Sequence, residues 1–190
     1  MPRAAAYSLA VNHRQGPVTP RLLLRAMTPD DAEAFFRFNS HPEVMRYTGE
    51  PPMASIDAAR EAIEHYPDWD DPGYGRWGCV LRSEGSTAAP IGFCGLKYLP
   101  ETGEVDIGYR LLPEYWGQGL ATEAARATLD YGFSTLRLSE IVAMVLPANA
   151  SSIRVLEKLG MVRADDITYE GQTVQRWVIT APQTPSTPQA

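Results

Sequence analysis

The segment from Leu111 to Ala124 reads LLPEYWGQGLATEA, in which two glycines flank one glutamine directly before a run with helical spacing. Small residues at 117, 119 and 121 leave the backbone uncovered where that helix begins. The first amides of a helix have no partner within it, and together with the helix dipole they attract phosphate groups. Glycine also lets an anion approach these amides closely. The pattern allows a phosphate-binding cradle, although a plain strand-to-helix turn fits the same residues.

Two common nucleotide-binding motifs do not fit this turn. A Walker A loop continues with lysine and a hydroxyl residue after its last glycine, whereas Gly119 is followed by Leu120, Ala121 and Thr122. A dinucleotide fingerprint needs glycine or alanine three residues after its second glycine, and Thr122 occupies that position. The sequence therefore disfavours both classes of nucleotide site.

The other reactive side chains form no familiar catalytic arrangement. His13, His41 and His65 lie in unrelated segments without Ser, Cys or metal-ligand spacing around them, so neither a histidine-based mechanism nor a metal site is predicted. Glu104 and Asp106 share one face of a predicted strand. They are candidates for a general base, for a solvated edge or for a salt bridge with Arg110.

Composition limits the partners of this chain. With 190 residues and 44% hydrophobic content, it is predicted to form one domain with a sizeable core. A net charge of -6 and a pI near 5.1 argue against nucleic acid or an anionic membrane as a partner. A highly anionic ligand must then be held locally, by backbone dipoles or a few cations.

The ends of the chain and its cysteines suggest a cytoplasmic protein. Neither end has an apolar run that could span a bilayer, and the start lacks the pattern of a signal peptide. Cys79 and Cys94 are expected to be packed and reduced. We expect an N-terminal extension at 1–19, one domain at 20–181 and a flexible, proline-rich tail at 182–190.

Strand and helix signals interleave along the domain. Residues 104–112 alternate strictly, with Val105, Ile107, Tyr109 and Leu111 on one face. Further strands are predicted at 21–27, 76–82, 91–99, 141–146 and 172–180. Helices are predicted to start at Thr28, Ser55 and Leu120, and a fourth at 150–160 to end on a left-handed Gly160. The expected class is α/β or α+β with one mixed sheet.

Three motifs together resemble the GNAT acetyltransferases of the RimJ/RimL branch. They are DIGY at 106–109, PEYWGQGLATEA at 113–124 and NASSIRVLEKLGM at 149–161, and the likeness extends over about residues 20 to 180. The resemblance implies the GNAT fold, a twisted and mostly antiparallel mixed sheet of about six to seven strands with about four helices. It also implies an enzyme, an acyltransferase that uses acetyl-CoA as cosubstrate and no metal.

By this resemblance, backbone groups would hold most of the coenzyme. The family's phosphate loop falls on residues 116–121, with Trp116 where many members have Gln or Arg. The implied pyrophosphate contacts are the amides of Gly117, Gln118, Gly119, Leu120, Ala121 and Thr122. The strand end at Leu111 and Leu112 would offer backbone groups to pantetheine and to the acetyl carbonyl, where an amide can stabilise an oxyanion. Core packing of these two leucines is compatible with that role.

The same resemblance assigns side chains to the chemistry. Asn149 would bind pantetheine, with an N-cap as the alternative. Ser152 would donate a proton to the departing thiolate, because Leu156 stands where other branches have tyrosine; a serine that merely faces the cofactor is the alternative. An alkylammonium with a pKa of about 10 is charged at pH 7, so Asp106 or Glu104 would help to generate the neutral amine.

The acceptor side is less defined by the sequence. By the resemblance, residues 28–66 would form one wall of the acceptor cleft. The next stretch is acidic and aromatic and could attract a cationic amine, or could be an exposed loop; it contains Asp68, Trp69, Asp70, Asp71 and Tyr74.

The expected reaction is direct attack of a primary amine in a ternary complex. The acceptor would be the N-terminal α-amine of a protein, such as a ribosomal protein, or a small molecule: an amino acid, a polyamine or an antibiotic. A non-catalytic module that binds acetyl-CoA as a sensor is a further alternative. The sequence does not distinguish a monomer from a homodimer.

Overall fold

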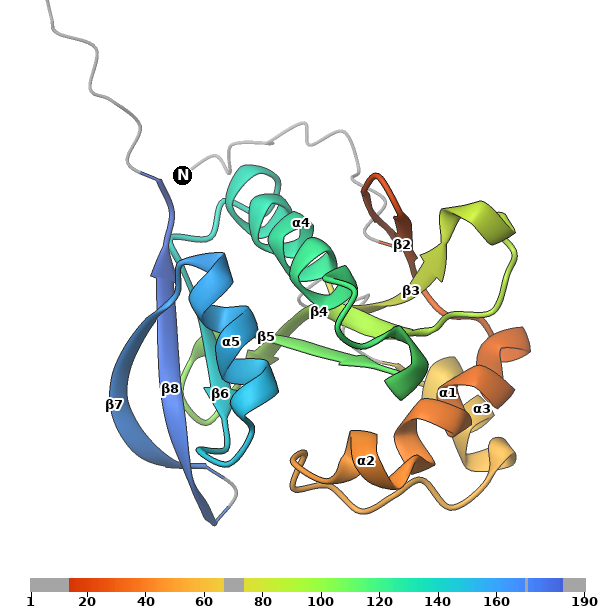
Figure 1. Cartoon of the computed structure of the whole chain (residues 1–190), viewed down its shortest axis with the longest axis horizontal. Helices are drawn as coiled ribbons and strands as arrows, with labels where there is room; N and C mark the ends of the chain where they lie inside the picture. The colour runs from red at the N-terminus through yellow and green to blue at the C-terminus, as the bar shows by residue number, and fades with distance from the viewer. Residues whose placement is uncertain (1–13, 67–73, 170, 183–190) are drawn as a thin grey trace, which may run out of the picture.

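The structure, a computed structural model, describes residues 14–66, 74–169 and 171–182. In these residues one sheet of eight strands runs in the order β1-β2-β3-β4-β5-β6-β8-β7 (Figure 1). Its strands are β1 (Gln15–Val18), β2 (Leu22–Arg25), β3 (Arg76–Leu81), β4 (Gly92–Leu99), β5 (Glu104–Leu111), β6 (Glu140–Val145), β7 (Val162–Tyr169) and β8 (Gln172–Thr180). Only β5 and β6 pair in parallel. The sheet is therefore mixed and mostly antiparallel, as predicted.

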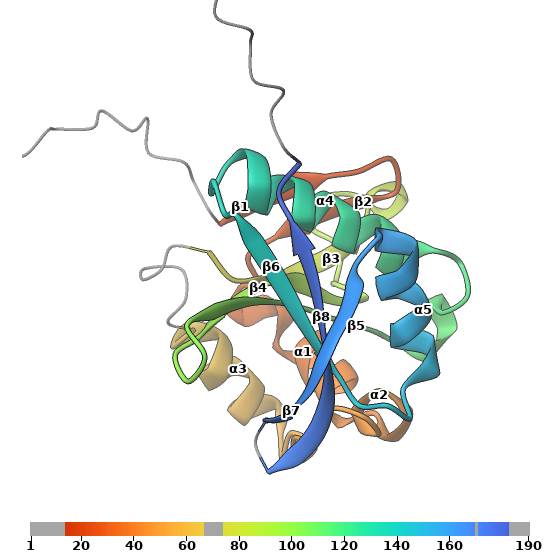
Figure 2. The same ribbon diagram turned by 90° about the vertical axis from the view of Figure 1, so that its left-hand side faces the viewer.

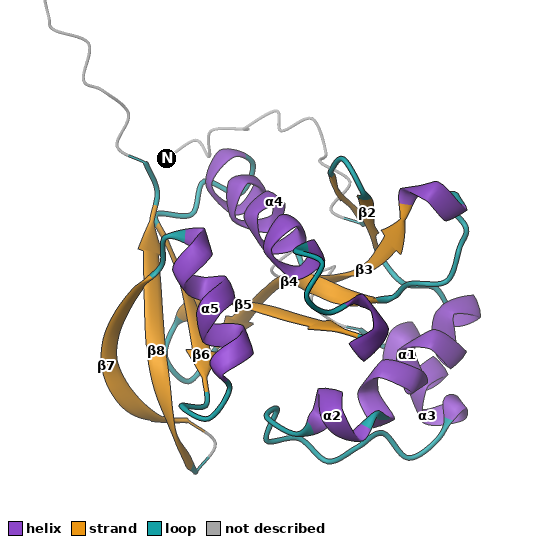
Figure 3. Ribbon diagram, in the orientation of Figure 1, coloured by secondary structure: helices purple, strands orange, loops and turns teal. Residues whose placement is uncertain are grey.

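The helices of the described residues are coloured purple in Figure 3. They are α1 (Ala32–Ser40), α2 (Pro42–Met45), α3 (Ile56–Glu64), α4 (Leu120–Ser134) and α5 (Ala150–Leu159), with short 3-10 turns η1 (Pro29–Asp31), η3 (Arg82–Glu84) and η4 (Pro113–Tyr115). The predicted caps are present at two helices. Ser55 Oγ accepts the Ala58 amide at 3.1 Å, and Gly160 ends α5 with a φ of 81°. Thr28 precedes the turn η1, which leads directly into α1.

Three elements are absent from the sequence prediction, and each has a weak signal. Strand β1 has only the four residues QGPV, and it lies inside the segment expected to be an N-terminal extension. Strand β7 is an edge strand whose side chains are mostly exposed and polar, so it lacks apolar alternation. Helix α2 is a single turn. With β1 and β7, the strand count is slightly higher than expected.

Helices α1 and α4 cover opposite faces of the sheet. The ring of Phe93 on β4 packs edge-on against Phe38 of α1, with 6.0 Å between ring centroids. The next residue, Cys94, has its sulfur 3.4 Å from Thr128 Oγ1 of α4. Because successive strand residues point to opposite faces, these two contacts place the two helices on opposite sides. Figure 2 shows α4 above β4, and α1 and α3 below it.

Strands β5 and β6 diverge. Strand β5 pairs with β4 at eight positions, from Glu104 to Leu111, but with β6 only where Asp106 lies opposite Val142. The two parallel strands therefore separate toward their carboxyl ends, and crevices at such ends commonly bind ligands.

In the described parts of the chain, no helix is both long and apolar enough to cross a membrane.

Candidate active site

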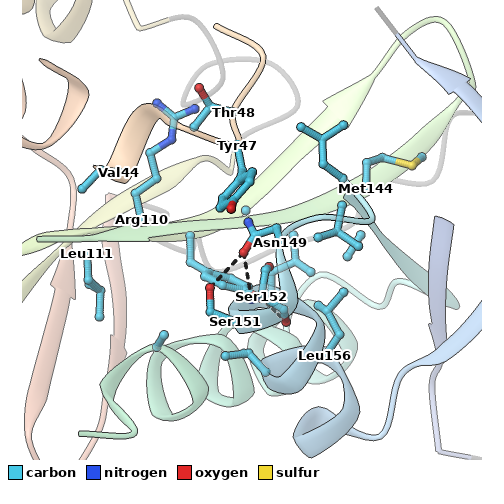
Figure 4. Close-up of a pocket in the computed structure, with 18 of the residues that line it drawn as sticks. Val44, Tyr47, Thr48, Arg110, Leu111, Met144, Asn149, Ser151, Ser152 and Leu156 are labelled. Atoms are coloured by element: carbon cyan, nitrogen blue, oxygen red, sulfur yellow. Dashed lines mark hydrogen bonds between the residues drawn. The ribbon is translucent and has the colours of Figure 1, made fainter. Parts of the chain in front are cut away.

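A cavity of about 650 Å³ occupies the gap between β5 and β6 (Figure 4). Its wall includes Asp106 and Arg110 from one face of β5, and Tyr109 and Leu111 from the other. Because these residues alternate along one strand, the cavity reaches both faces of the sheet. Its volume lies within the usual range of about 300–1,000 Å³ for small-molecule sites.

The glycine loop forms one end of this cavity. Gly117 and Gly119 have φ angles of 74° and 78°, a left-handed conformation that glycine adopts without strain. Gly119 is the N-cap of α4, and the Glu123 amide is the first to bond back, to the Gly119 carbonyl at 3.0 Å. The preceding amides of the first turn have no carbonyl within the helix. The cavity wall includes Gly117, Gly119, Leu120, Ala121 and Thr122, so the loop fits an anion.

Gln118 points away from this cavity, and its backbone helps to anchor the loop. Its side-chain amide donates to the Glu114 carbonyl at 2.9 Å, and its own carbonyl accepts from Arg21 Nη1 at 2.9 Å. Arg21 Nε also bonds to Glu123 at 2.6 Å, and the Thr19 hydroxyl donates to the same carboxylate at 2.6 Å.

This cluster at Glu123 fixes the first turn of α4. Burial would raise the pKa of Glu123, but the bonds from Thr19 and Arg21 lower it below the ordinary value. The contact joins residues 102 positions apart. No local sequence signal could have predicted it.

At the end of β5, the backbone groups of Leu111 and Leu112 form different hydrogen bonds. The Leu112 amide donates to the Ile91 carbonyl at 3.0 Å, and the Leu112 side chain, which does not line the cavity, packs with Phe38 and Phe93. Leu111 lines the cavity, and its carbonyl accepts the Trp116 indole N–H at 2.6 Å. The Leu112 amide is thus used within the sheet, whereas Trp116 braces the strand end.

Asn149 and Ser152 lie at the start of α5, on the glycine-loop side of β5. Asn149 Oδ1 accepts the Ser152 amide at 3.1 Å and the Ser151 hydroxyl at 2.9 Å, so the N-cap role is present (Figure 4). The Ser152 hydroxyl is 2.8 Å from that of Tyr109. Burial raises the pKa of Tyr109, which keeps its phenol neutral. The sequence placed Tyr109 on this face but did not predict its contact with Ser152.

The two predicted carboxylates are in different surroundings. Asp106 lines the cavity and is 8% exposed, and its Oδ1 accepts the Met144 amide at 3.3 Å. Burial raises the pKa of Asp106, although Arg76 opposes the shift. A raised pKa suits a carboxylate that must accept a proton near neutral pH.

Glu104 lies outside the cavity and bonds to Arg176 Nε at 2.8 Å. The suggested salt bridge of these carboxylates with Arg110 is wrong, because Arg110 pairs with Glu50 at 2.6 Å. Arg110 is thereby directed toward the loop after α2.

The other wall of the cavity comes from α2 and the loop that follows. Val44, Tyr47 and Thr48 face the cavity from this side (Figure 4). The predicted acidic cluster at Asp68, Trp69, Asp70 and Asp71 lies outside the described residues, and Tyr74 is buried in the core. Within the described ranges, no three His, Cys, Asp or Glu residues gather as metal ligands, and both cysteines are free and buried.

Comparisons with known proteins agree with this geometry. A family model for the acetyltransferase (GNAT) domain matches residues 21–162. The uncharacterised N-acetyltransferase YoaA of Bacillus subtilis is 40% identical over 143 residues, which cover 75% of this chain and 80% of YoaA. Spermidine N(1)-acetyltransferase of Escherichia coli is 27% identical over 148 residues, covering 77% of this chain and 76% of that protein.

A solved structure gives the same result for the fold. The crystal structure of an acetyltransferase from Agrobacterium tumefaciens has a TM-score of 0.71 and 28% identity, covering 86% of this chain and 92% of that one. These three proteins do not distinguish the RimJ/RimL-type branch from others, so the branch stays a prediction. GNAT acetyltransferases use acetyl-CoA, a ligand whose pyrophosphate suits a glycine loop at a helix start. With its family domain spanning residues 21–162, the chain belongs to the GNAT superfamily and is an N-acetyltransferase.

Proposed function

We propose that this enzyme transfers acetyl from acetyl-CoA to a primary amine that attacks directly in a ternary complex. The observation that carries the proposal is the cavity through the β5–β6 gap, which joins the glycine loop on one face to Asp106 on the other. Donor and acceptor can therefore bind at the same time from opposite faces of the sheet. Direct transfer needs this arrangement, because the two reactants must meet without a covalent enzyme intermediate.

On the donor side, the amides of residues 117–122 would hold the pyrophosphate. The Leu111 amide would polarise the acetyl carbonyl, since the Leu112 amide is already bonded within the sheet. Asn149 uses its side-chain oxygen as the N-cap, and we assign its side-chain N–H donors to pantetheine. The hydrogen bond from Trp116 to the Leu111 carbonyl supports the role of the Leu111 amide, because it holds the strand end in place before the coenzyme binds.

Asp106 on the acceptor side is the proposed base, and Ser152 on the donor side is the proposed acid. The ammonium gives one proton to Asp106, the amine nitrogen bonds to the acetyl carbon, and the carbon–sulfur bond breaks. The proton lost by the amine nitrogen after attack passes to solvent, while Ser152 gives its proton to the thiolate. Tyr109, 2.8 Å from the Ser152 hydroxyl, can then relay a proton from solvent to it, taking up one proton as it gives its own, so that both hydroxyls end neutral. Glu104 is not part of this proposal, because Arg176 holds it outside the cavity.

We also propose, from the sequence motifs, that the chain belongs to the RimJ/RimL-type branch. An N-terminal α-amine of a protein is then one candidate acceptor. The likeness to spermidine N(1)-acetyltransferase supports a small amine as the other. Both classes use the same donor site and differ only in what the acceptor face must hold.

Two measurements test the proposal. Coenzyme A at 100 times its Kd should stabilise the folded chain by about 2.7 kcal/mol in a thermal scan. Thiol release from acetyl-CoA should depend on the amine when N-terminal peptides, polyamines and amino acids are compared. Tight coenzyme binding without turnover across that panel would favour the sensor alternative. A scan without any shift would argue against coenzyme binding altogether.

A further inference from the structure

Arg76 lies flat across two glycines of the sheet. It is opposite Gly95 of β4, which is in turn opposite Gly108 of β5. A Cβ placed on Gly108 would be 2.9 Å from Arg76 Nη2 and 3.1 Å from its Nε. Glycine inside a strand often marks such a close approach. The side chain of Arg76 therefore crosses β4 and brings its guanidinium beside Asp106.

The guanidinium of Arg76 has fewer and longer polar contacts than the neighbouring guanidinium of Arg110. Within the described residues, its buried Nε has no hydrogen-bond partner, and its ion pair with Asp106 is long, at 3.5 Å. Arg110 instead bonds to Asn39 at 2.7 Å and to Glu50 at 2.6 Å. Both guanidiniums stack on the ring of Phe93, 5.2 and 5.3 Å from its centroid. A largely buried charge is costly without a close partner, so this position favours an anion.

A second cavity of about 180 Å³ adjoins the first at this point. The two cavities share Glu50, Arg76, Phe93 and Arg110. The rest of the smaller one is mostly apolar and is formed by Met27, Phe35, Asn39, Met45, Pro51, Met53 and Tyr66. An apolar cavity of about 150 Å³ can hold a benzene molecule, so this one has room for an apolar side chain.

We propose that the preferred acceptor is an α-amino acid with an apolar side chain. This inference rests on the acetyl transfer proposed above. The amino group would lie at Asp106, the carboxylate at Arg76 and the side chain in the smaller cavity. Each charge of the acceptor then meets an opposite charge.

The charges around the larger cavity separate this acceptor from the two alternatives. Its described wall has six cationic residues, of which Arg154 and Lys158 belong to α5 at the proposed coenzyme end. The other four are Arg46, Arg76, Lys97 and Arg110, and the wall has three carboxylates, Glu43, Glu50 and Asp106. A polyamine would bring only positive charge to this surface. A protein N-terminus has an amide where the amino acid has its carboxylate, so it would leave Arg76 with only its long ion pair to Asp106.

The test compares matched acceptors with the full chain and saturating acetyl-CoA. L-Leucine, L-leucinamide and 3-methylbutylamine share one side chain and differ in the carboxylate, and spermidine and an N-terminal peptide complete the set. We expect kcat/KM for leucine to exceed that for its amide by at least about 30-fold, as for a charge-assisted bond worth about 2 kcal/mol. Equal or faster transfer to the amide, to spermidine or to the peptide would overturn the inference.

Two variants test whether the preference for leucine over leucinamide depends on Arg76. Arg76→Gln should reduce the ratio of leucine to leucinamide to within about threefold, mainly through the KM for leucine. Arg46→Gln is the matched control, because it removes a cation from the same cavity wall at a side chain stacked on Tyr47. It should keep the wild-type ratio. An unchanged ratio in a folded Arg76→Gln protein would also overturn the inference.

The outcomes separate this inference from the proposed function. Fast transfer to spermidine or the peptide without a preference for carboxylates leaves acetyl transfer standing and removes the amino-acid acceptor. No transfer to any acceptor, despite coenzyme binding, contradicts both. The wild-type ratio decides without any variant, so a folding defect in Arg76→Gln does not prevent the test.

Discussion

The two ends of the cavity present different kinds of groups, backbone at one end and side chains at the other. The end proposed for the coenzyme is mostly backbone: the glycine loop, the amides that begin α4 and the strand end at Leu111. The end proposed for the acceptor is mostly side chains from separate elements, with Asp106 from β5 and Arg76 from β3. A backbone site depends on chain conformation, whereas a side-chain site changes with each substitution. We therefore expect relatives to keep the first kind of site and to differ in the second.

Asp106→Asn should cause the largest loss of activity, and it should leave coenzyme binding almost unchanged. Asparagine can still accept the Met144 amide but cannot take a proton. We expect kcat to fall by about 1,000-fold, within the range of general acid–base catalysis. The Kd for coenzyme A should change by less than about twofold. Thiol-release kinetics and titration calorimetry measure the two quantities.

The pH dependence gives a second measure of the same change. Because burial raises the pKa of Asp106, the wild-type kcat should increase as pH passes a value above the ordinary carboxyl range. This limb of the profile should be absent from the variant. A loss of coenzyme affinity as large as the loss of kcat would instead place Asp106 at the donor end.

Gly119→Val should affect the coenzyme end alone. A β-branched residue at a φ of 78° is strained, and it would cover the amides of the loop. We expect coenzyme affinity to fall by about 100-fold, equivalent to about 2.7 kcal/mol. Gly85→Val is the control, since Gly85 also has a positive φ of 93° but lies outside the cavity. Gly85→Val should lower the stability of the protein without lowering its affinity for coenzyme A. Unchanged affinity for coenzyme A in a folded Gly119→Val protein would refute the proposed phosphate-binding role of the loop.

Two ion pairs allow a comparison of a pair outside the cavity with one at the glycine loop. Arg25 holds Asp31, directly before α1, through two bonds of 2.7 and 2.9 Å, whereas Arg21 holds Glu123 at the glycine loop through one guanidinium bond of 2.6 Å. Asp31→Asn should lower the free energy of unfolding at pH 7 by about 2 kcal/mol, because it breaks a largely buried pair. Coenzyme affinity should not change. Glu123→Gln should cost less stability but weaken coenzyme binding about fivefold, by loosening the first turn of α4.

Acid should remove the contribution of Asp31. Burial would raise the pKa of Asp31, but the bonds from Arg25 and the Thr28 amide lower it below its ordinary value. Stability from a lowered pKa is present above the unfolded value of about 3.9 and is lost as pH falls through the lower folded value. The difference between wild type and Asp31→Asn in urea unfolding should therefore shrink below about pH 4. A constant difference down to pH 3 would contradict this.

The two hydroxyl substitutions, Ser152→Ala and Tyr109→Phe, should lower kcat much less than Asp106→Asn. Ser152 is proposed to protonate a thiolate, which is a good leaving group even without help. We expect kcat to fall by about tenfold, below the common range for general acids. Tyr109→Phe should cost about threefold, because it removes only the group that would reprotonate Ser152. A larger loss from Tyr109→Phe than from Ser152→Ala would make the tyrosine the acid.

The sequence predicted best the features with a local cause. The left-handed end of α5 at Gly160, the cap at Ser55 and the alternation of β5 each depend on a few neighbouring residues. Together with the family motifs, these signals predicted the fold, and they are the basis of the proposed coenzyme loop.

Contacts between distant residues could not be predicted in the same way. Alternation placed Glu104 and Asp106 on one face, but it could not show that Arg176, 72 positions away, holds Glu104 outside the cavity. Nor could it show that the Leu112 amide is used by Ile91, or that Arg76 reaches over Gly108. Edge strands such as β7 lack apolar alternation because solvent covers most of their side chains.

The alternation of β5 also limits how such an enzyme can evolve. One strand supplies both ends of the cavity, with Asp106 and Arg110 on one face and Tyr109 and Leu111 on the other. Inserting or deleting one residue within it would move every later side chain to the opposite face, exchanging donor and acceptor groups. Changes of length should therefore be excluded from β5 and tolerated in the loop after α2. A new acceptor can be acquired by grafting that loop, while β5 keeps its length.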